Sequence, residues 1–438
     1  MSEGKGRNFV LLTQDHKQYF FPPNIIMPAS ILPIANEQYR PDSISSLMRN
    51  EAILQTFSFI KISASEFTDE HIRICEIPAP PFQEELRGQY IASRFRELGL
   101  ADVHTDSEGN VIGFYHGDIE GQLLVVSAHL DTVFPAGTDF KVRKFSSKIL
   151  APGIGDNASG LAAMIAMIRL LNIGNFKTRG SIAFVATVGE EGEGDLRGAK
   201  HLFYTGTLSG KISQFISFDG PGNDFITHQA LGSRRYRIAF EGPGGHSWTD
   251  FGTVNPIHAI GRAIARIAEF PVPQNPRTTY NVGRIEGGTS VNVIPERASF
   301  DVDIRSTDEY ELSRVEDFLL SSVNHAMRSE NSLRAGAHHS LKLDVNLIGH
   351  RPSGETSEHA PLVQTAIEAT KAVGVQPWLN CASTDANIPI SLGIQAITIG
   401  AGGKGGDAHR LTEWYEPTGR ESGYQRALLL ILATAGLR

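Results

Sequence analysis

Two things are scarce in this sequence: cysteine and long runs of apolar residues. Only Cys75 and Cys381 are present, far apart and outside any Cys-x-x-Cys pattern, which excludes a disulfide-rich scaffold. No apolar segment reaches the roughly 18 residues that a membrane-spanning helix needs. The apolar run at residues 9–12 is too short for the core of an export signal. We therefore expect a cytoplasmic protein without a membrane partner.

Charge of one sign is not concentrated anywhere along the chain. The formal net charge is −8, with acids and bases interspersed. Nucleic-acid-binding proteins usually carry basic patches or stripes, and none is visible here, so no nucleic-acid partner is expected. The 438 residues, 41% of them hydrophobic, are enough for two domains with sizeable cores.

Strands and helices alternate over most of the chain. Helical spacing of apolar residues begins near residue 43 and recurs at 84–98 and 158–171. Continuous apolar runs at 123–128, 182–188 and 212–218 are typical of buried strands. This alternation predicts an α/β layer structure with a mostly parallel central sheet and flanking helices.

The pattern changes between residues 231 and 346. Segments 235–240 and 298–304 alternate apolar and polar residues, as half-exposed antiparallel strands do. Helical patterns lie at 256–269 and 308–328, so a four-stranded antiparallel sheet with two helices is expected. The predicted organisation is an N-terminal arm (1–42), a discontinuous catalytic domain (43–230 and 347–438) and an inserted α+β domain (231–346).

Acidic and histidine residues follow the predicted strands. Strand 123–128 runs directly into His129, and Asp131 points to the same side two residues later. The next strand is followed by Glu190 and Glu191, adjacent carboxylates that repel each other unless a cation or a proton relieves the repulsion. Because ligands of open parallel sheets bind at the carboxyl ends of the strands, these side chains are expected to gather there.

Three further residues complete the set. Asp156 lies in a glycine-rich segment before an apolar helix, where capping of that helix by Asp156 or Asn157 is the alternative interpretation. Asp219 follows another apolar strand, and His409 lies in a glycine-rich loop. Carboxylates and imidazoles without thiolates suit zinc, and also cobalt or manganese. Five ligands are too many for one catalytic zinc and suit two ions bridged by a carboxylate, with a sixth acid available as general base.

In order and spacing, these segments resemble the metallopeptidase family that includes peptidase T, carboxypeptidase G, succinyl-diaminopimelate desuccinylase and acetylornithine deacetylase. The resemblance covers about residues 65–438. It rests on segments 127–133, 155–160, 190–191, 244–247 and 288–295, with Asp219 and His409. It implies two divalent metal ions per subunit, held by His129, Asp156, Glu191, Asp219 and His409. His129 and Asp219 would hold one ion, Glu191 and His409 the other, and Asp156 would bridge them.

The resemblance also implies the catalytic residues. Glu190 would be the general base that activates the attacking water and then protonates the leaving amine. Asp131 would accept a hydrogen bond from His129 and so determine its tautomer. The peptide bond between Asp156 and Asn157 would be cis, as is usual in this family.

The inserted domain resembles the dimerisation domain of the family, which implies a homodimer. His246 would reach into the neighbouring subunit's site and stabilise the tetrahedral oxyanion. Asn292 and Arg305 match substrate-contacting positions, and Thr384 and Asp385 match polar residues near the site.

The predicted function is metal-dependent hydrolysis of an amide bond in small peptides. Within the family, Asp rather than Glu at the fourth ligand tends to accompany aminopeptidase activity, so Asp219 favours a di- or tripeptide aminopeptidase resembling peptidase T. The alternative is an N-acyl amino-acid deacylase or a carboxypeptidase-like amidohydrolase, and the need for a free α-amine or a free α-carboxylate separates the two. A catalytically silent metal- or peptide-binding relative would normally lack the base or a ligand, and all of these are present.

Overall fold

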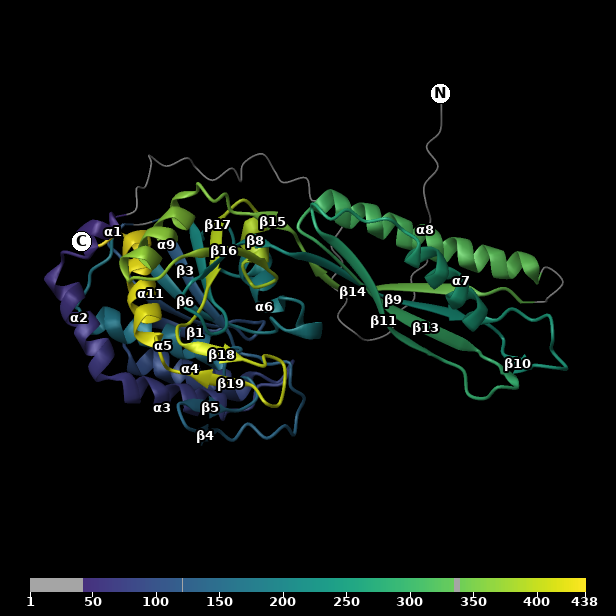
Figure 1. Cartoon of the computed structure of the whole chain (residues 1–438), viewed down its shortest axis with the longest axis horizontal. Coiled ribbons are helices and arrows are strands. Elements are labelled where there is room, and N and C mark those ends of the chain that lie inside the picture. Colours follow the sequence, from purple (N-terminus) through teal and green to yellow (C-terminus); the bar gives the residue numbers. More distant parts are fainter. Residues whose placement is uncertain (1–41, 120, 335–338) are drawn as a thin grey trace, which may run out of the picture. The chain divides into compact units, whose positions relative to one another are not determined.

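The computed structural model describes residues 42–119, 121–334 and 339–438 (Figure 1). The predicted N-terminal arm therefore lies outside the described residues, apart from Asp42. The first elements are α1 (Ile44–Leu47), α2 (Glu51–Ile62), α3 (Ala64–Cys75), α4 (Glu85–Glu97), β1 (Ala101–Thr105), β2 (Val111–Tyr115), β3 (Leu123–His129), β4 (Arg143–Phe145), β5 (Lys148–Leu150), α5 (Ala158–Ile173), β6 (Ser181–Thr187), α6 (Arg197–Lys200), β7 (Gln214–Phe218) and β8 (Phe225–Ala230).

The remaining elements form a smaller sheet with its helices and then return to the first sheet. The smaller unit contains β9 (Gly232–Glu241), β10 (Gly245–His246), α7 (Pro256–Ala268), β11 (Thr278–Gly287), β12 (Val293–Ile294), β13 (Arg297–Ser306), α8 (Glu309–Leu333) and β14 (Lys342–Arg351). The chain continues through β15 (Gly354–Glu355), α9 (Pro361–Ala372), β16 (Trp378–Ala382), α10 (Asn387–Ser391), β17 (Gln395–Ile399), β18 (Lys404–Gly406), β19 (Trp414–Glu416) and α11 (Arg420–Ala435).

The large sheet has a parallel centre with antiparallel edges. Its order is β1-β2-β6-β3-β7-β17-β8-β15, with β16 paired to β8. The four central strands β6, β3, β7 and β17 run parallel, whereas β2 and β8 join them antiparallel. The α/β prediction is confirmed, and the sheet is mixed because its edge strands reverse direction. The carboxyl ends of β3, β6 and β7 therefore lie side by side.

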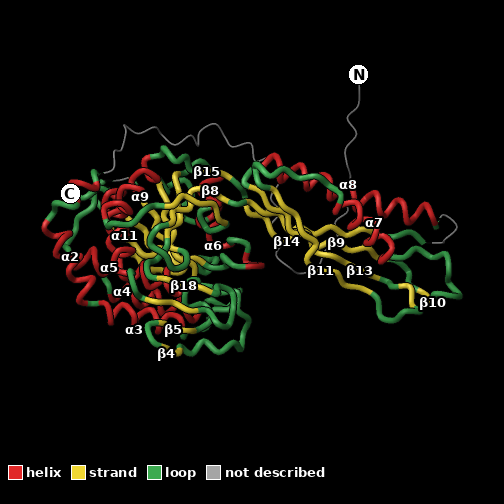
Figure 2. Tube along the Cα trace, in the orientation of Figure 1, coloured by secondary structure: helices red, strands yellow, loops and turns green. Residues whose placement is uncertain are grey.

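Helices cover both faces of this sheet (Figure 2). One face packs against α4, α5, α9 and α11 in the larger hydrophobic core, which includes the fully buried Leu161, Ile182 and Leu429. The other face packs against α6 and α10 around Leu202 and Ile388. Helix α5 is apolar on all sides, as expected of a helix buried in a core.

Local signals explain where the sequence prediction missed boundaries. The helical pattern that begins near residue 43 is two helices, because the Asn50 side chain accepts hydrogen bonds from the N–H groups of Ala52 and Ile53 and caps a new start. Helix α3 and strands β1 and β2 were not predicted. Cys75 is buried, whereas Cys381 is only partly buried.

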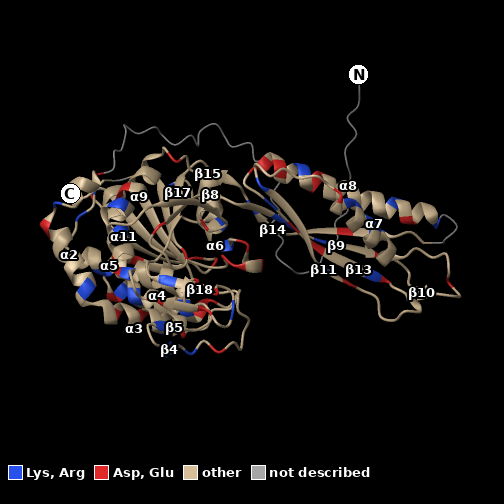
Figure 3. Ribbon diagram, in the orientation of Figure 1, with Lys and Arg blue, Asp and Glu red and all other residues tan. Residues whose placement is uncertain are grey.

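The smaller sheet is antiparallel, in the order β11-β13-β9-β14. Helices α7 and α8 cover one face of it (Figure 1), and its core includes Ile238, Phe300 and Val323. The prediction of four antiparallel strands with two helices is thus confirmed. Lysines and arginines are interspersed with acids along the described elements (Figure 3). None of the helices in the described residues is both long and apolar enough to cross a membrane.

Candidate metal centre

Three strand ends and two loops bring six acidic and histidine side chains together. Three overlapping groups have ligand atoms that lie within 4.8 Å of one another: His129 with Asp156 and Asp219, His129 with Glu190 and Glu191, and Asp156 with Glu191 and His409. His129 ends β3, Glu190 and Glu191 follow β6, and Asp219 follows β7. The parallel pairing of these strands places their carboxyl ends together, as the sequence predicted.

Asp156 lies between the two histidines. Its Oδ1 is 3.0 Å from His129 Nε2, and its Oδ2 is 3.0 Å from His409 Nε2. Asn157, not Asp156, caps α5, because its side chain accepts a hydrogen bond from the Gly160 N–H. The Asp156 carboxylate is therefore available to the cluster, and the peptide bond that follows it is cis, as the family resemblance implied.

Each histidine also faces one further carboxylate. His129 Nε2 lies 3.6 Å from Asp219 Oδ1, and His409 Nε2 lies 3.0 Å from Glu191 Oε1. The donors thus divide into two sets of one imidazole and one carboxylate, with Asp156 shared. This donor set fits a pair of divalent ions of the zinc, cobalt or manganese type.

The electrostatics of the cluster indicate a place for positive charge. Hydrogen bonds with Asp156 and Glu191 raise the pKa of His409 to about 11. Burial lowers the pKa of His129, but hydrogen bonds with Asp131, Asp156 and Asp219 outweigh it and raise that pKa well above its ordinary value. Divalent cations at these atoms would take the place of protons, so metal binding is expected to release protons.

Asp131 connects the end of β3 to the turn that carries the two adjacent glutamates. Its carboxylate accepts hydrogen bonds from the N–H groups of Glu190 (3.0 Å) and Glu191 (2.8 Å). His129 Nδ1 lies 3.1 Å from the Asp131 main-chain oxygen and 3.5 Å from its carboxylate. Asp131 is fully buried and therefore orients both the histidine and the glutamate turn.

Glu190 has a cationic partner that sequence reasoning missed. Arg351, at the end of β14, lies 3.0 Å from Glu190 Oε1 and also donates to the Glu190 main-chain oxygen. Both side chains are about 95% buried. Burial raises the pKa of Glu190 well above its ordinary value, and the charge of Arg351 opposes part of that shift.

Replacing Arg351 with methionine should therefore raise the pKa of Glu190 further. If Glu190 acts as a base, the acidic limb of the kcat/KM profile should move to higher pH, because the carboxylate stays protonated to a higher pH. The free energy of unfolding should also fall by about 3 kcal/mol, because a buried ion pair loses one partner. pH–rate profiles and chemical denaturation measure both effects. Arg351→Lys keeps the charge and serves as the control, and an unmoved acidic limb in Arg351→Met would contradict the prediction.

Three predicted site residues lie elsewhere in the chain. His246 is exposed, and its Nδ1 accepts from the Trp248 N–H at 3.2 Å. Asn292 is also exposed. It lies beside His246 because β10, which contains His246, pairs with β12, which begins one residue after Asn292. Arg305, on β13, donates to Asp303 at 2.7 Å. None of the three belongs to the metal-ligating groups found in the described residues.

Two further acids, Asp385 and Glu413, are buried beside the elements that carry the cluster. Burial raises the pKa of Asp385 to about 6, and its Oδ2 accepts from Thr187 at 2.5 Å. Glu413, which sequence reasoning missed, is 1% exposed and binds the loop that carries Asp156. The only sequence signal for Glu413 is its position four residues after His409.

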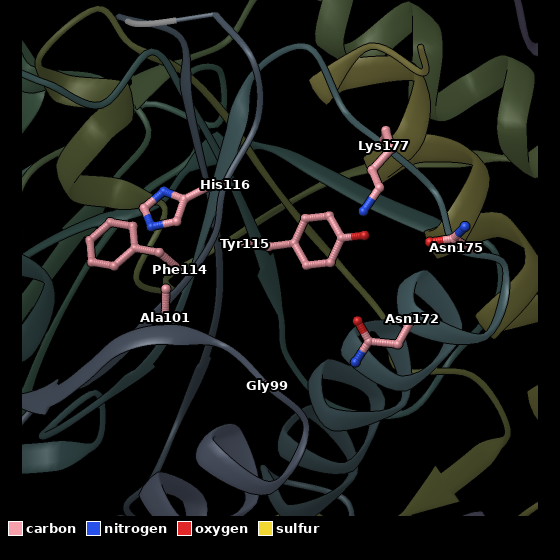
Figure 4. Close-up of a pocket in the computed structure, with 8 residues that line it drawn as sticks. All are labelled: Gly99, Ala101, Phe114, Tyr115, His116, Asn172, Asn175 and Lys177. Carbon is pink, nitrogen blue, oxygen red and sulfur yellow. The ribbon is translucent and has the colours of Figure 1, made fainter.

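A separate pocket lies near the amino end of β6 (Figure 4), whereas the cluster lies at the carboxyl ends of the strands. Tyr115 ends β2 opposite Ile182, which lies near the start of β6, so this pocket is remote from the strand ends that carry the cluster. Its lining is Gly99, Ala101, Phe114, Tyr115, His116, Asn172, Asn175 and Lys177. None of these is a predicted site residue.

Comparison with known proteins assigns the family. A sequence model described as peptidase family M20/M25/M40 matches residues 125–433, which is more than half of the chain. The chain belongs to this family. The prediction from the motifs is confirmed, and this M20-family chain is a hydrolytic metallopeptidase.

Relatives of this M20-family peptidase include proteins from bacteria and archaea. The uncharacterized protein YqjE of Bacillus subtilis is 23% identical over 355 residues, covering 78% of this chain and 91% of that protein. Thermostable carboxypeptidase 2 of Saccharolobus solfataricus is 25% identical over 262 residues, covering 58% and 66%. The structure of aminopeptidase PepT from Bacillus cereus superposes with a TM-score of 0.68 at 20% identity, covering 85% of this chain and 99% of that one.

Proposed function

We propose that this M20-family peptidase is an aminopeptidase that removes N-terminal residues from di- and tripeptides. The observation that carries the proposal is Asp219, the carboxylate that faces His129, because Asp rather than Glu at this ligand tends to accompany aminopeptidase activity in the family. The fold shared with an enzyme described as an aminopeptidase supports the same substrate class. The metal ions are proposed to be two zinc ions, with cobalt or manganese as substitutes.

The proposed ligands are five of the six side chains that the groups contain, all but Glu190. His129 and Asp219 would hold one ion, Glu191 and His409 the other, and Asp156 both. When bound, the ions would polarise the scissile carbonyl and lower the pKa of the attacking water. The protein's own residues would carry the remaining steps.

Glu190 is the proposed proton carrier. It adjoins the ligand Glu191, and Asp131 and Arg351 hold it in place through hydrogen bonds to its N–H group and its carboxylate. As general base it would take a proton from the attacking water. The same proton would then be transferred to the leaving amine as the tetrahedral intermediate collapses.

Residues 231–346 are proposed to form a dimerisation domain within the catalytic domain (43–230 and 347–438). Trp248 is 86% exposed and Phe251 is 80% exposed, next to His246. Large exposed aromatic side chains of this kind are typical of interaction surfaces. In a homodimer, His246 would act in the partner's site and donate to the oxyanion, with Asn292 and Arg305 contacting substrate.

His246→Ala should lower kcat by about 10²–10³-fold, as the loss of one oxyanion donor does. If the histidine acts in the other subunit, mixing His246→Ala with inactive Glu190→Gln should restore activity. In each mixed dimer one site would combine an intact Glu190 with an intact His246, so a random mixture should recover about a quarter of wild-type activity. Steady-state assays after subunit exchange measure this. A mixture no more active than its components, although mixed dimers form, would contradict action in trans.

Substrate class can be tested with one tripeptide in free and N-acetylated forms beside an N-acetyl amino acid. The protein would be loaded separately with zinc, cobalt and manganese. Metal-dependent cleavage confined to the free tripeptide is the expected result. The similarity to a carboxypeptidase favours the second candidate, an N-acyl amino-acid deacylase or carboxypeptidase-like amidohydrolase. Cleavage of the acylated substrates alone would establish that candidate and refute the aminopeptidase.

A further inference from the structure

Glu413 binds the main chain of the loop that carries Asp156. Its Oε1 accepts hydrogen bonds from the N–H groups of Gly155 and Asp156, both at 2.8 Å, and its Oε2 accepts from the Gly153 N–H at 2.7 Å. The residue is 1% exposed. A buried carboxylate is costly unless its oxygens are hydrogen-bonded, and these three main-chain donors meet that need.

The loop is shaped to admit this carboxylate. A Cβ atom on Gly155 would lie 2.9 Å from Glu413 Oε1, so any larger residue at this position would displace the carboxylate or the loop. Gly153 has φ of +72°, a left-handed conformation that glycine adopts readily. The close approach therefore depends on Gly155 having no side chain.

The same residue connects the segments that carry Asp156 and His409. Strand β19 begins at the next residue and pairs with β5, and the Glu413 main-chain oxygen accepts from the Ala151 N–H at 3.1 Å. His409 lies four residues before Glu413, with its Nε2 3.0 Å from Asp156 Oδ2. Glu413 thus joins two loops that are about 250 residues apart in sequence and meet at one carboxylate–imidazole pair.

We propose that Glu413 is a positioning residue for the metal centre. Its carboxylate holds the Asp156 main chain so that the two carboxylate oxygens point to the two histidines. It touches neither substrate nor metal, and it acts on metal affinity through Asp156. This inference rests on the proposed role of Asp156 as the ligand shared by two ions.

Glu413→Gln tests the inference because it keeps the size of the side chain. Its amide oxygen can still accept from Gly155 and Asp156, but its NH₂ group would face the Gly153 N–H, donor against donor. Metal affinity should fall by about 10–100-fold, the usual effect of removing the partner of a ligand. Competition with a chelator measures the affinity, and the visible absorption of the cobalt-loaded protein reports a changed ligand geometry.

Glu330→Gln is the matched control. Glu330 is also fully buried and accepts a main-chain hydrogen bond, from the Asn255 N–H at 3.1 Å, but it lies in α8 and pairs with Arg262. Both variants should lower the melting temperature. Only Glu413→Gln should weaken metal binding and alter the cobalt spectrum, which a purely structural role would leave unchanged.

A second variant keeps the test decisive if Glu413→Gln does not fold. Gly155→Ala leaves Glu413 intact but places a methyl group against its carboxylate, so metal affinity should fall in the same way. The inference is overturned if the folded variant, Glu413→Gln or else Gly155→Ala, keeps the metal affinity and the cobalt spectrum of the wild type. If the wild-type chain itself binds no divalent ions, the proposed metal centre fails and the inference fails with it. If the wild-type chain binds two ions and the variant binds them equally well, only the inference fails.

Discussion

Glu190→Gln should lower kcat by about 10²–10⁴-fold while the protein keeps its full metal content. Glutamine has the size of glutamate, and its amide oxygen can still accept from Arg351, which lies 3.0 Å from Glu190 Oε1. The amide cannot take a proton from water near neutral pH, so the proton transfer is lost and the surrounding contacts remain. Steady-state kinetics on the free tripeptide and metal analysis by mass spectrometry measure the two quantities.

Glu193→Gln is the control for this substitution. Glu193 is an exposed acid three residues along the same turn, and it belongs to none of the metal-ligating groups. Its variant removes the same charge from the same segment and should retain wild-type kcat. Substantial activity in Glu190→Gln would show that another group is the base. Loss of metal from that variant would show that Glu190 is a ligand instead.

Asp156→Asn should abolish binding of both metal ions and reduce activity to the background rate. The two Asp156 oxygens each lie 3.0 Å from one histidine Nε2, and an asparagine offers only one oxygen to that pair. Removing the shared carboxylate therefore weakens both proposed sites, whereas removing an unshared ligand would weaken one. Isothermal titration with zinc should show two ions in the wild type and none in the variant.

Thermal stability gives a second measure of the same substitution. A ligand at 100 times its dissociation constant stabilises the folded state by about 2.7 kcal/mol per site, so added zinc should raise the melting temperature of the wild type. The melting temperature of Asp156→Asn should not respond. Asp407→Asn removes an equal charge from the loop that carries His409 and should respond as the wild type does. Two ions bound to Asp156→Asn would remove Asp156 from the ligand set.

The site residues that the sequence predicted most directly are those that follow the ends of neighbouring parallel strands. His129, Glu190 and Asp219 come directly after or at the ends of apolar runs, so their convergence needed only the strand directions and the order of the sheet. The structure adds that Asp156 divides its two oxygens between two histidines, a detail that spacing does not contain. It also shows that Asn157 caps α5, which separates the two interpretations that the segment allowed.

Secondary structure was harder to predict where local signals compete. Apolar periodicity runs through residues 43–60 without an obvious interruption, yet α1 ends at Leu47 and Asn50 caps a second helix. Strand β1 lies at the edge of the sheet and has no continuous apolar run, and the apolar run of its neighbour β2 is interrupted by Gly113. For these elements, pairing with neighbours decides the conformation.

The sequence by itself determined the layered α/β architecture, the inserted antiparallel sheet and the candidate metal-ligating side chains, because periodicity and strand-end position are local properties. Only the tertiary structure decided what supports those side chains. Arg351 reaches Glu190 from 161 residues away, and Glu413 reaches the Asp156 N–H from 257 residues away. These partners are explained by burial. A charged group removed from water needs a hydrogen-bonding or oppositely charged partner, and the fold can supply that partner from any distance along the chain.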